Sequence, residues 1–192
     1  MRSALSHLNE VWAVDTAAAI LWHFGRELGW DFLSDGARWL YDESRHMMMG
    51  ARRLEWWGFK PHEIPLGSYI IESLEGQDPI YSLAMLAFFE TKNIGKKRSR
   101  AEEFGALGDL SSQRDMDFDW ADEAIHTGYG RRWLKAALKS RGQDPNLWPK
   151  LVDRCEELVR ARVDRASDED AEKIKVCAAR LVARAEELAA KG

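Results

Sequence analysis

The sequence contains the same short motif twice, and the two copies have matching surroundings. The first copy is Asp42-Glu43-Ser44-Arg45-His46 and the second is Asp122-Glu123-Ala124-Ile125-His126, which are separated by an offset of 80 residues. A glycine follows each histidine by four positions, and another glutamate precedes each motif glutamate by 33 positions. This shared spacing predicts an internal repeat, and therefore a fold built from two similar halves.

Helices are the predicted secondary structure throughout the chain. No stretch shows the alternation of apolar and polar residues that is typical of a half-buried strand. Prolines occur in only three places, and the stretches between them predict long helices over about residues 4–27, 31–57, 80–94 and 118–140, with a short helix over 68–75. Residues 95–116 are expected to be helix interrupted by a loop around residues 105–112.

Two pairs of long helices account for the repeat. Each pair carries one upstream glutamate and one motif, so two helix hairpins would pack into a four-helix bundle over residues 1–144. Residues 145–192 predict one or two charged amphipathic helices with a break near residue 167. We expect this C-terminal extension to pack on the bundle or to form an interface. The predicted fold class is all-α.

The motifs predict a site with two metal ions. On a helix, residues three positions apart lie on one face, so each Glu-x-x-His aims a carboxylate and an imidazole at one point. In di-iron and di-manganese carboxylate bundles, two helices each supply one glutamate and the other two each supply a Glu-x-x-His motif. The sequence has the same set, and the six predicted ligands are Glu10, Glu43, His46, Glu90, Glu123 and His126.

The chemistry of these side chains favours iron or manganese. Four carboxylates neutralise two divalent cations, and imidazoles suit iron or manganese better than magnesium or calcium. Four carboxylates buried without cations would strongly destabilise the fold. We therefore predict two iron ions as the cofactor, with manganese as the alternative.

The first ligand has a rival on its own helix. The repeat offset favours Glu10, because Glu10 stands to Glu43 as Glu90 stands to Glu123. Asp15 is also flanked by apolar residues, and it would be level with Glu43 if the first helix pairs symmetrically across the turn near Gly29. Both candidates therefore stay open.

The motif regions resemble a known group of proteins. The stretches DESRHMMMG and DEAIHTGYGRRWL, within a resemblance that covers about residues 4–140, are similar to the ferritin-like superfamily of di-iron carboxylate proteins. Within it they resemble uncharacterised bacterial ferritin-like proteins related to the tRNA-modifying di-iron hydroxylases. The resemblance implies a ferritin-like four-helix bundle with the same six ligands. It also implies that Glu43 and Glu123, or a pair including one of them, bridge the metals.

The resemblance assigns a role to the aspartate that precedes each motif glutamate. Asp42 would accept a hydrogen bond from the outer ring nitrogen of His126, and Asp122 would accept one from His46. Such bonds fix the tautomer and the orientation of a metal-binding imidazole.

The function that the resemblance implies is that of a non-haem di-iron or di-manganese oxidoreductase. It would activate dioxygen to oxidise or hydroxylate a small-molecule substrate and would need an electron donor, with no catalytic residue beyond the metal ligands. The breaks at residues 76–79 and 95–116 favour an enzyme over a storage cage. Two alternatives remain: a ferroxidase, iron-handling or peroxide-removing ferritin-like protein, and a metal-free helical interaction module.

Composition limits the partners and the compartment. The net charge of −4 gives no general reason to bind nucleic acid or an anionic membrane, and the apolar stretches are too short to span a bilayer. The basic run 96–100 is expected to be a solvated helix end, with an anionic-substrate site as the alternative. Cys155 and Cys177 form no disulfide framework, and no signal peptide is visible. We expect a cytoplasmic protein that can form a homodimer.

Overall fold

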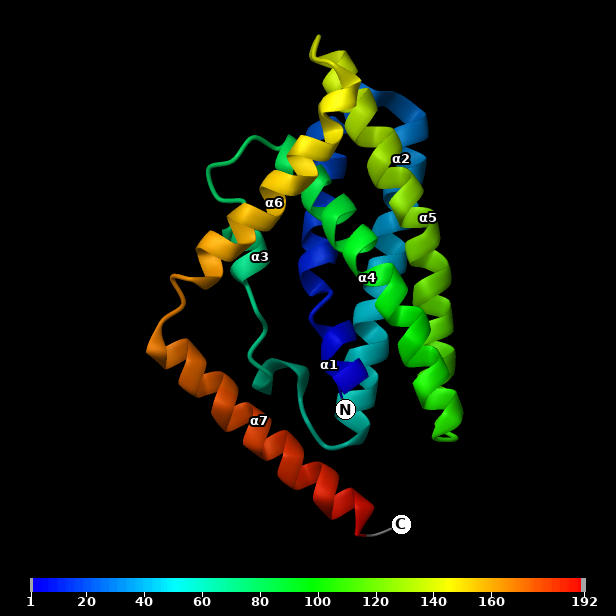
Figure 1. Ribbon diagram of the computed structural model, residues 1–192. Helices are drawn as coiled ribbons and strands as arrows, with labels where there is room; N and C mark the ends of the chain where they lie inside the picture. The colour runs from blue at the N-terminus through cyan, green and yellow to red at the C-terminus, as the bar shows by residue number, and fades with distance from the viewer. Residues whose placement is uncertain (1, 191–192) are drawn as a thin grey trace.

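The computed structural model describes residues 2–190, which form helices joined by short loops (Figure 1). The helices are α1 (Arg2–Leu8), α2 (Val11–Trp56), α3 (Tyr69–Glu72), α4 (Ile80–Ala106), α5 (Leu110–Ser140), α6 (Trp148–Val163) and α7 (Asp168–Ala189), and the 3₁₀ helices are η1 (Pro61–Glu63) and η2 (Pro145–Leu147). No strand occurs within residues 2–190. The prediction of an all-α fold is therefore confirmed.

Helix α2 consists of two segments that meet at Gly29. Gly29 has φ 78° and ψ −166°, a backbone conformation that a glycine adopts without steric cost. The chain turns back on itself there, as Figure 1 shows, and the two segments pack closely on each other. A Cβ atom on Gly36 would lie 2.8 Å from a methyl carbon of Leu21, and one on Gly25 would lie 2.7 Å from Leu33. The predicted end of the first long helix at this glycine is correct.

Helices α4 and α5 form a second pair, which packs against both segments of α2. The interior is filled by apolar side chains from all four long segments. Those with no exposed surface include Ile20, Phe24, Phe32, Trp39, Leu83, Leu86 and Leu134. Burying side chains of this kind contributes about 1.5–3 kcal/mol each to folding. This interior fixes the spacing of the helices that carry the predicted ligands.

The repeat also appears in how helices touch. Gly50 lies against α1, where an added Cβ atom would come within 2.3 Å of the Ala4 carbonyl oxygen and 2.9 Å of the His7 Cβ atom. Gly130 lies against α4, where an added Cβ atom would come within 2.6 Å of the Ala87 Cβ atom. The two glycines are 80 residues apart, and so are His7 and Ala87, which face them. Each half of the molecule therefore uses a glycine to bring two helices close together.

Two predicted boundaries were wrong, and one predicted loop is confirmed. The first long helix is interrupted at Asn9 and Glu10, which form a turn between α1 and α2. The loop expected around residues 105–112 is present as residues 107–109, between the end of α4 and the start of α5. Helix α5 starts early because the Asp109 side chain accepts a hydrogen bond from the Ser112 backbone N–H at 3.0 Å, which caps the helix.

The C-terminal extension divides into two parts. Helix α6 packs on the helical core, where Cys155 is fully buried. Helix α7 lies along the loop that follows α2, and Arg184 Nε donates to the Trp57 carbonyl oxygen at 2.7 Å. The predicted break is present, because the Ser167 side chain caps the start of α7. An interface with another chain stays a prediction.

No described helix is both long enough and apolar enough to cross a membrane.

Candidate metal centre

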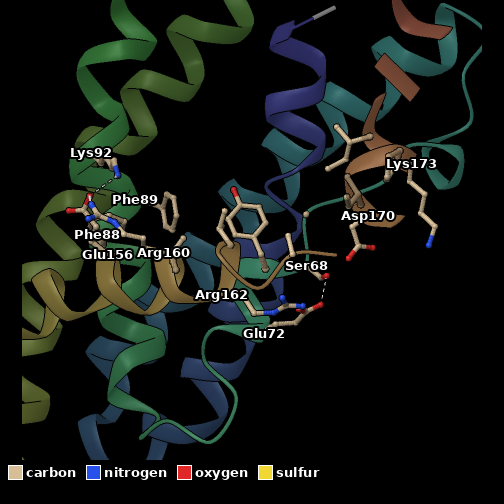
Figure 2. A pocket seen from close by; sticks show the side chains of 18 residues that line it. Ser68, Glu72, Phe88, Phe89, Lys92, Glu156, Arg160, Arg162, Asp170 and Lys173 are labelled. Carbon is tan, nitrogen blue, oxygen red and sulfur yellow. Dashed lines mark hydrogen bonds and ion pairs between the residues drawn. The ribbon is translucent and has the colours of Figure 1, made fainter. Parts of the chain in front are cut away.

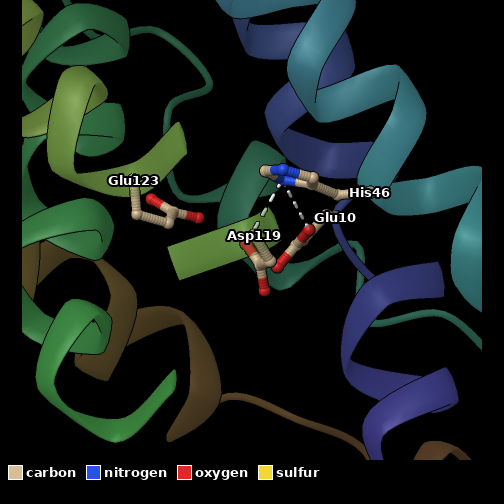
Figure 3. A group of neighbouring side chains, drawn as sticks. All are labelled: Glu10, His46, Asp119 and Glu123. Carbon is tan, nitrogen blue, oxygen red and sulfur yellow. Dashed lines mark ion pairs between the residues drawn. The ribbon is translucent and has the colours of Figure 1, made fainter. Parts of the chain in front are cut away.

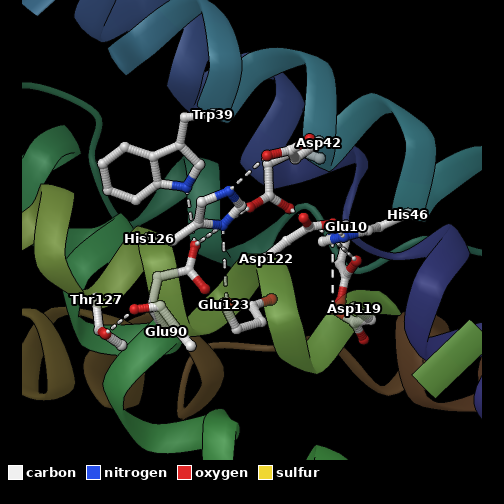
Figure 4. A network of polar contacts seen from close by, with 12 residues as sticks. Glu10, Trp39, Asp42, His46, Glu90, Asp119, Asp122, Glu123, His126 and Thr127 are labelled. Carbon is white, nitrogen blue, oxygen red and sulfur yellow. Dashed lines mark hydrogen bonds and ion pairs between the residues drawn. The ribbon is translucent and has the colours of Figure 1, made fainter. Parts of the chain in front are cut away.

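The structure brings all six predicted ligands together in the middle of the helical core (Figure 4). They form two groups, and within each group one ligand atom per residue lies within 4.8 Å of the others. The first group contains Glu10, His46, Asp119 and Glu123, and the second contains Glu43, Glu90, Glu123 and His126. Glu123 belongs to both groups, so its carboxylate lies between two candidate cation positions.

Four elements supply these side chains. The second segment of α2 carries Glu43 and His46, α5 carries Glu123 and His126, and α4 carries Glu90. In both motifs the spacing of three residues turns the carboxylate and the imidazole to the same side. Glu10 differs from the expectation because it lies in the turn before α2, with φ −68° and ψ 0°. The turn still directs its carboxylate to His46 (Figure 3).

The centre contains buried polar atoms that no neighbouring group satisfies. Among residues 2–190, five such atoms in the two groups lack a hydrogen-bond partner: Glu10 Oε2, Glu43 Oε1, His46 Nδ1, Glu123 Oε2 and His126 Nδ1. Buried polar atoms are nearly always hydrogen-bonded, and leaving one unsatisfied costs about 1–3 kcal/mol. Carboxylate oxygens and imidazole nitrogens are metal ligands, so their unpartnered state fits bound cations.

Each histidine is held by an aspartate from the other motif. The His46 Nε2–H donates to Asp122 Oδ2 at 3.0 Å, and the His126 Nε2–H donates to Asp42 Oδ2 at 3.4 Å. These are the two pairs that the resemblance implied. Each ring therefore turns its Nδ1 atom to the carboxylates, at 3.4 Å from Glu10 Oε2 for His46 and 3.2 Å from Glu43 Oε1 for His126.

Two arginines neutralise these aspartates. Arg38 Nε donates to Asp42 Oδ2 at 2.6 Å, and Arg45 contacts Asp122. Burial favours the neutral form of Asp122, but hydrogen bonds from His46 and Arg45 lower its pKa below the ordinary value. Both aspartates can therefore remain hydrogen-bond acceptors for the histidines.

The two histidines and Glu90 have raised pKa values. Burial disfavours a charged imidazole, but hydrogen bonds to nearby carboxylates raise the pKa of His46 to about 12 and that of His126 to about 11. Burial and the charge of Glu43 raise the pKa of Glu90 to about 7. A centre that retains protons in this way has a strongly negative potential, which also attracts metal cations.

Sequence reasoning missed two residues of the centre. Asp119 is fully buried, and its Oδ1 atom lies 3.4 Å from His46 Nδ1. Lys97 is also buried, so the prediction of a solvated helix end was wrong for this residue. Helical spacing was the available signal, because Asp119 precedes Glu123 by four residues and Lys97 follows Glu90 by seven.

The rival first ligand does not reach the centre. Asp15 is exposed and belongs to neither group of candidate ligands. Its side chain points outward because α2 starts only after Glu10, and the buried face of that segment is formed by Trp12, Ala13, Thr16 and Ala17. The alternative that placed Asp15 in the site is therefore wrong.

Residues 1–173 match a family that is described as a protein of unknown function, DUF455. The chain belongs to the DUF455 family. No curated protein and no solved structure matches the chain. The DUF455 match includes both candidate metal positions and α6, but the family description assigns no chemistry to them.

A small cavity in this DUF455 protein adjoins the centre. Its volume is about 170 Å³, and four of the glutamates line it together with Lys97. The apolar part of its wall comes from Trp12, Ile70 and Phe89, with Tyr69 beside them. The candidate ligands therefore border a small space with a polar side, formed by the carboxylates and Lys97, and an apolar side.

A larger groove lies outside this cavity, between α3, α4, α6 and α7 (Figure 2). Its volume is about 690 Å³, and Tyr69 and Phe89 line both the groove and the small cavity. The charged side chains at its rim form ion pairs with each other or with neighbours, including Lys92 Nζ with Glu156 Oε1 at 3.6 Å and Arg162 with Glu72. The groove therefore presents an apolar floor and a rim whose charges largely cancel.

Proposed function

We propose that this protein is a ferritin-like four-helix bundle that binds two iron or manganese ions and uses them to oxidise or hydroxylate a small molecule with dioxygen. The observation that carries the proposal is the group of unpartnered, buried ligand atoms that two repeated motifs direct to one place. The crossed aspartate–histidine hydrogen bonds support it, because metal-binding histidines are commonly oriented in this way.

The charge of the centre also supports two divalent cations. Five carboxylates and the Lys97 ammonium together carry a charge of −4, which two divalent cations would balance; the carboxylates are Glu10, Glu43, Glu90, Asp119 and Glu123. Two imidazoles in the donor set favour iron or manganese over magnesium or calcium.

The side chains of the chain would perform three tasks. Glu123 belongs to both groups, and the two oxygens of Glu43 lie 3.8 Å from His46 Nδ1 and 3.2 Å from His126 Nδ1, so both carboxylates are suited to bridge two ions. Asp42 and Asp122 orient the imidazoles, and the Trp39 Nε1–H fixes Glu90 by donating to its Oε1 atom at 3.0 Å. Trp12, Ile70 and Phe89 form the apolar side of the small cavity and shield that side of the centre from water. Two redox-active ions bound there would supply the open coordination positions needed to reduce dioxygen.

The groove suggests how a substrate reaches the centre. Its rim offers no strong excess of one charge, so it fits a largely apolar small molecule better than an anionic one. Tyr69 and Phe89 separate the groove from the cavity, which places them at the passage. Replacing Tyr69 by alanine should speed the removal of bound Mn²⁺ by a bulky chelator. Leu66→Ala, which lines only the groove, is the matched control and should leave the rate unchanged.

Metal content tests the proposed function directly. Protein purified without chelator should contain about two iron or manganese ions per chain by elemental analysis. Glu43→Ala removes a carboxylate close to both histidines and should lose both ions, whereas His126→Ala alters only the second group and should retain about one. Asp15→Ala removes an exposed carboxylate from the same helix and should keep the wild-type content. Reduced, iron-loaded protein should then consume dioxygen.

Two results would contradict the proposal. If folded wild-type protein stays metal-free after incubation with Fe²⁺ without oxygen, the two-metal site is excluded. The remaining candidate function is then that of a helical interaction module. A large symmetric shell in a size measurement, with iron oxidised in the absence of any organic substrate, would favour iron storage over oxidation of a small molecule.

A further inference from the structure

The two halves of the centre differ at three positions of the repeat. His7 corresponds to Ala87, and Asp119 corresponds to Trp39. Lys97 corresponds to Ala17. The two members of each pair are 80 residues apart, as the metal-ligand candidates are. One member of each pair is ionisable and the other is not.

The three polar residues meet at one place. The His7 ring lies with Nε2 at 3.0 Å from Asp119 Oδ2, and Lys97 Nζ donates to Asp119 Oδ1 at 2.5 Å. All three side chains are almost completely buried, with exposed fractions of 1%, 0% and 5% for His7, Asp119 and Lys97. The departures from the repeat therefore form a single polar cluster beside the first group of candidate ligands.

The ammonium of Lys97 lies among the ligands of the first group. It donates to Glu10 Oε1 at 3.2 Å and also contacts Asp119 and Glu123. Three of the four residues of this group thus already coordinate a cation that belongs to the chain. The group still has unpartnered atoms, His46 Nδ1 and one oxygen each of Glu10 and Glu123, so the ammonium satisfies only part of it.

The second group has a different neighbour. Among the residues that the structure describes, no lysine or arginine forms an ion pair with Glu43 or Glu90, whose close cationic partners are the two histidines. Trp39 stands where the first group has Asp119, and its ring lies 5.4 Å from the His126 ring. Lys97 contacts this group only through the shared Glu123, whereas it contacts three residues of the first group, so an external cation can bind to Glu43, Glu90 and His126 with less displacement of the ammonium.

We infer that Lys97 is an internal cation that competes with metal for the position formed by the first group. Metal would therefore fill the position formed by Glu43, Glu90 and His126 before it fills the position beside Lys97. The inference rests on the proposed two-metal site and adds an order of loading to it. Lys97 also lines the small cavity, which gives its flexible side chain space to withdraw when metal enters. Loading the first position then requires a side-chain movement that the second does not.

A titration with Mn²⁺ alone tests this order. Metal-free wild-type protein should bind two Mn²⁺ ions in two separated steps in calorimetry, the second weaker than the first. Lys97→Met removes the charge and keeps the length of the side chain, so the second step should strengthen. If the state with the ammonium withdrawn is about one-tenth populated, the gain is roughly tenfold.

Matched variants isolate the effect of this one cation. Lys96→Met makes the same change at the adjacent, exposed residue and should leave both steps unchanged. Lys97→Arg keeps the charge and should keep the steps apart. Lys97→Gln serves if the methionine variant does not fold without metal, because the glutamine amide can still donate a hydrogen bond to the carboxylates.

A variant of the second group assigns the steps to the positions. Glu90→Gln removes a carboxylate found only in the second group, so it should abolish the tight step and leave the weak one. Equal affinities in the wild-type protein, or a Lys97→Met titration identical to wild type, would overturn the competition and leave the two-metal site standing. Failure of every variant and of the wild type to bind Mn²⁺ or Fe²⁺ would overturn both.

Discussion

The two halves of the molecule place their metal-ligand candidates alike and surround them differently. In the half that precedes residue 57, Glu43 and His46 face the centre, and in the half formed by α4 and α5, Glu123 and His126 do the same. Around one position the repeat supplies Trp39 and alanines, and around the other it supplies His7, Asp119 and Lys97. The comparison teaches that the repeat sets where the ligand candidates lie, while the residues around each group differ in charge and polarity.

The largest expected effect comes from the residue that the two positions share. Glu123→Ala should lose both metal ions, because this carboxylate belongs to both groups. Glu10→Ala, which alters only the first group, should retain about one ion per chain. Elemental analysis after gel filtration measures the difference. Retention of one ion by Glu123→Ala would show that the positions do not share a ligand.

Thermal unfolding adds a check on the same variants. A ligand that binds only the folded state stabilises it by about 2.7 kcal/mol at a free concentration of 100 times its Kd. Adding chelator should therefore lower the Tm of the wild-type protein and leave that of Glu123→Ala unchanged. Equal chelator effects on both proteins would mean that the metal binds elsewhere.

The aspartates that hold the histidines should act on one position each. Asp42→Ala releases His126 and should weaken the second position, whereas Asp122→Ala releases His46 and should weaken the first. Removing such partners typically costs 10- to 100-fold in metal affinity. In the Mn²⁺ titration, Asp42→Ala weakens the tight step and should bring the two steps together. Asp122→Ala weakens the weak step and should move the two steps apart. Asp35→Ala, on the same face of α2 but bonded to Trp133, is the control.

The sequence predicted which side chains meet at the centre because two motifs in the same register give strong, mutually supporting information. A helical spacing of three residues fixes which side chains share a face, and that inference survives errors in the helix ends. Glu10 reached the centre although its helix was wrongly assigned, since no glycine or proline marks the turn at Asn9 and Glu10.

The burial of Asp119 and Lys97 at the centre could not be predicted from the sequence pattern. A single aspartate on a charged helix, and a lysine within the run 96–100, are normally solvated, and only packing shows that they face inward. The position of α7 was also out of reach, because an amphipathic pattern predicts an apolar face and does not identify what covers it.

The glycines at the helix contacts extend the comparison to stability. Gly50→Ala would push α1 away and disturb His7, whereas Gly130→Ala would push α4, which carries Glu90. Overpacking of this kind costs about 1–3 kcal/mol in the free energy of unfolding. Gly50→Ala should weaken metal binding at the position of the first group, and Gly130→Ala should weaken it at the position of the second group.

Gly128 provides the control for these changes. It lies in α5 two residues before Gly130, but an added Cβ atom there would meet nothing within 4 Å. Gly128→Ala should therefore stabilise the protein by about 0.5–1 kcal/mol through helix propensity alone. Denaturant unfolding of the three variants measures the difference in the free energy of unfolding. A similar loss of stability at all three sites would show that close helix packing at Gly50 and Gly130 is not the cause.

The smallest effect is expected at Trp39, the residue that replaces Asp119 in the repeat. Trp39→Phe removes the N–H that donates to Glu90 but keeps an aromatic ring beside His126, so it should cost about 1 kcal/mol of stability. Trp133→Phe removes a similar bond, from Nε1 to Asp35 Oδ2 at 2.9 Å, far from the ligands. Both variants should lose similar stability, and only Trp39→Phe should weaken the tight Mn²⁺ step. If neither variant changes that step, Trp39 acts in the second half as packing alone, and the contrast between the positions depends on Lys97.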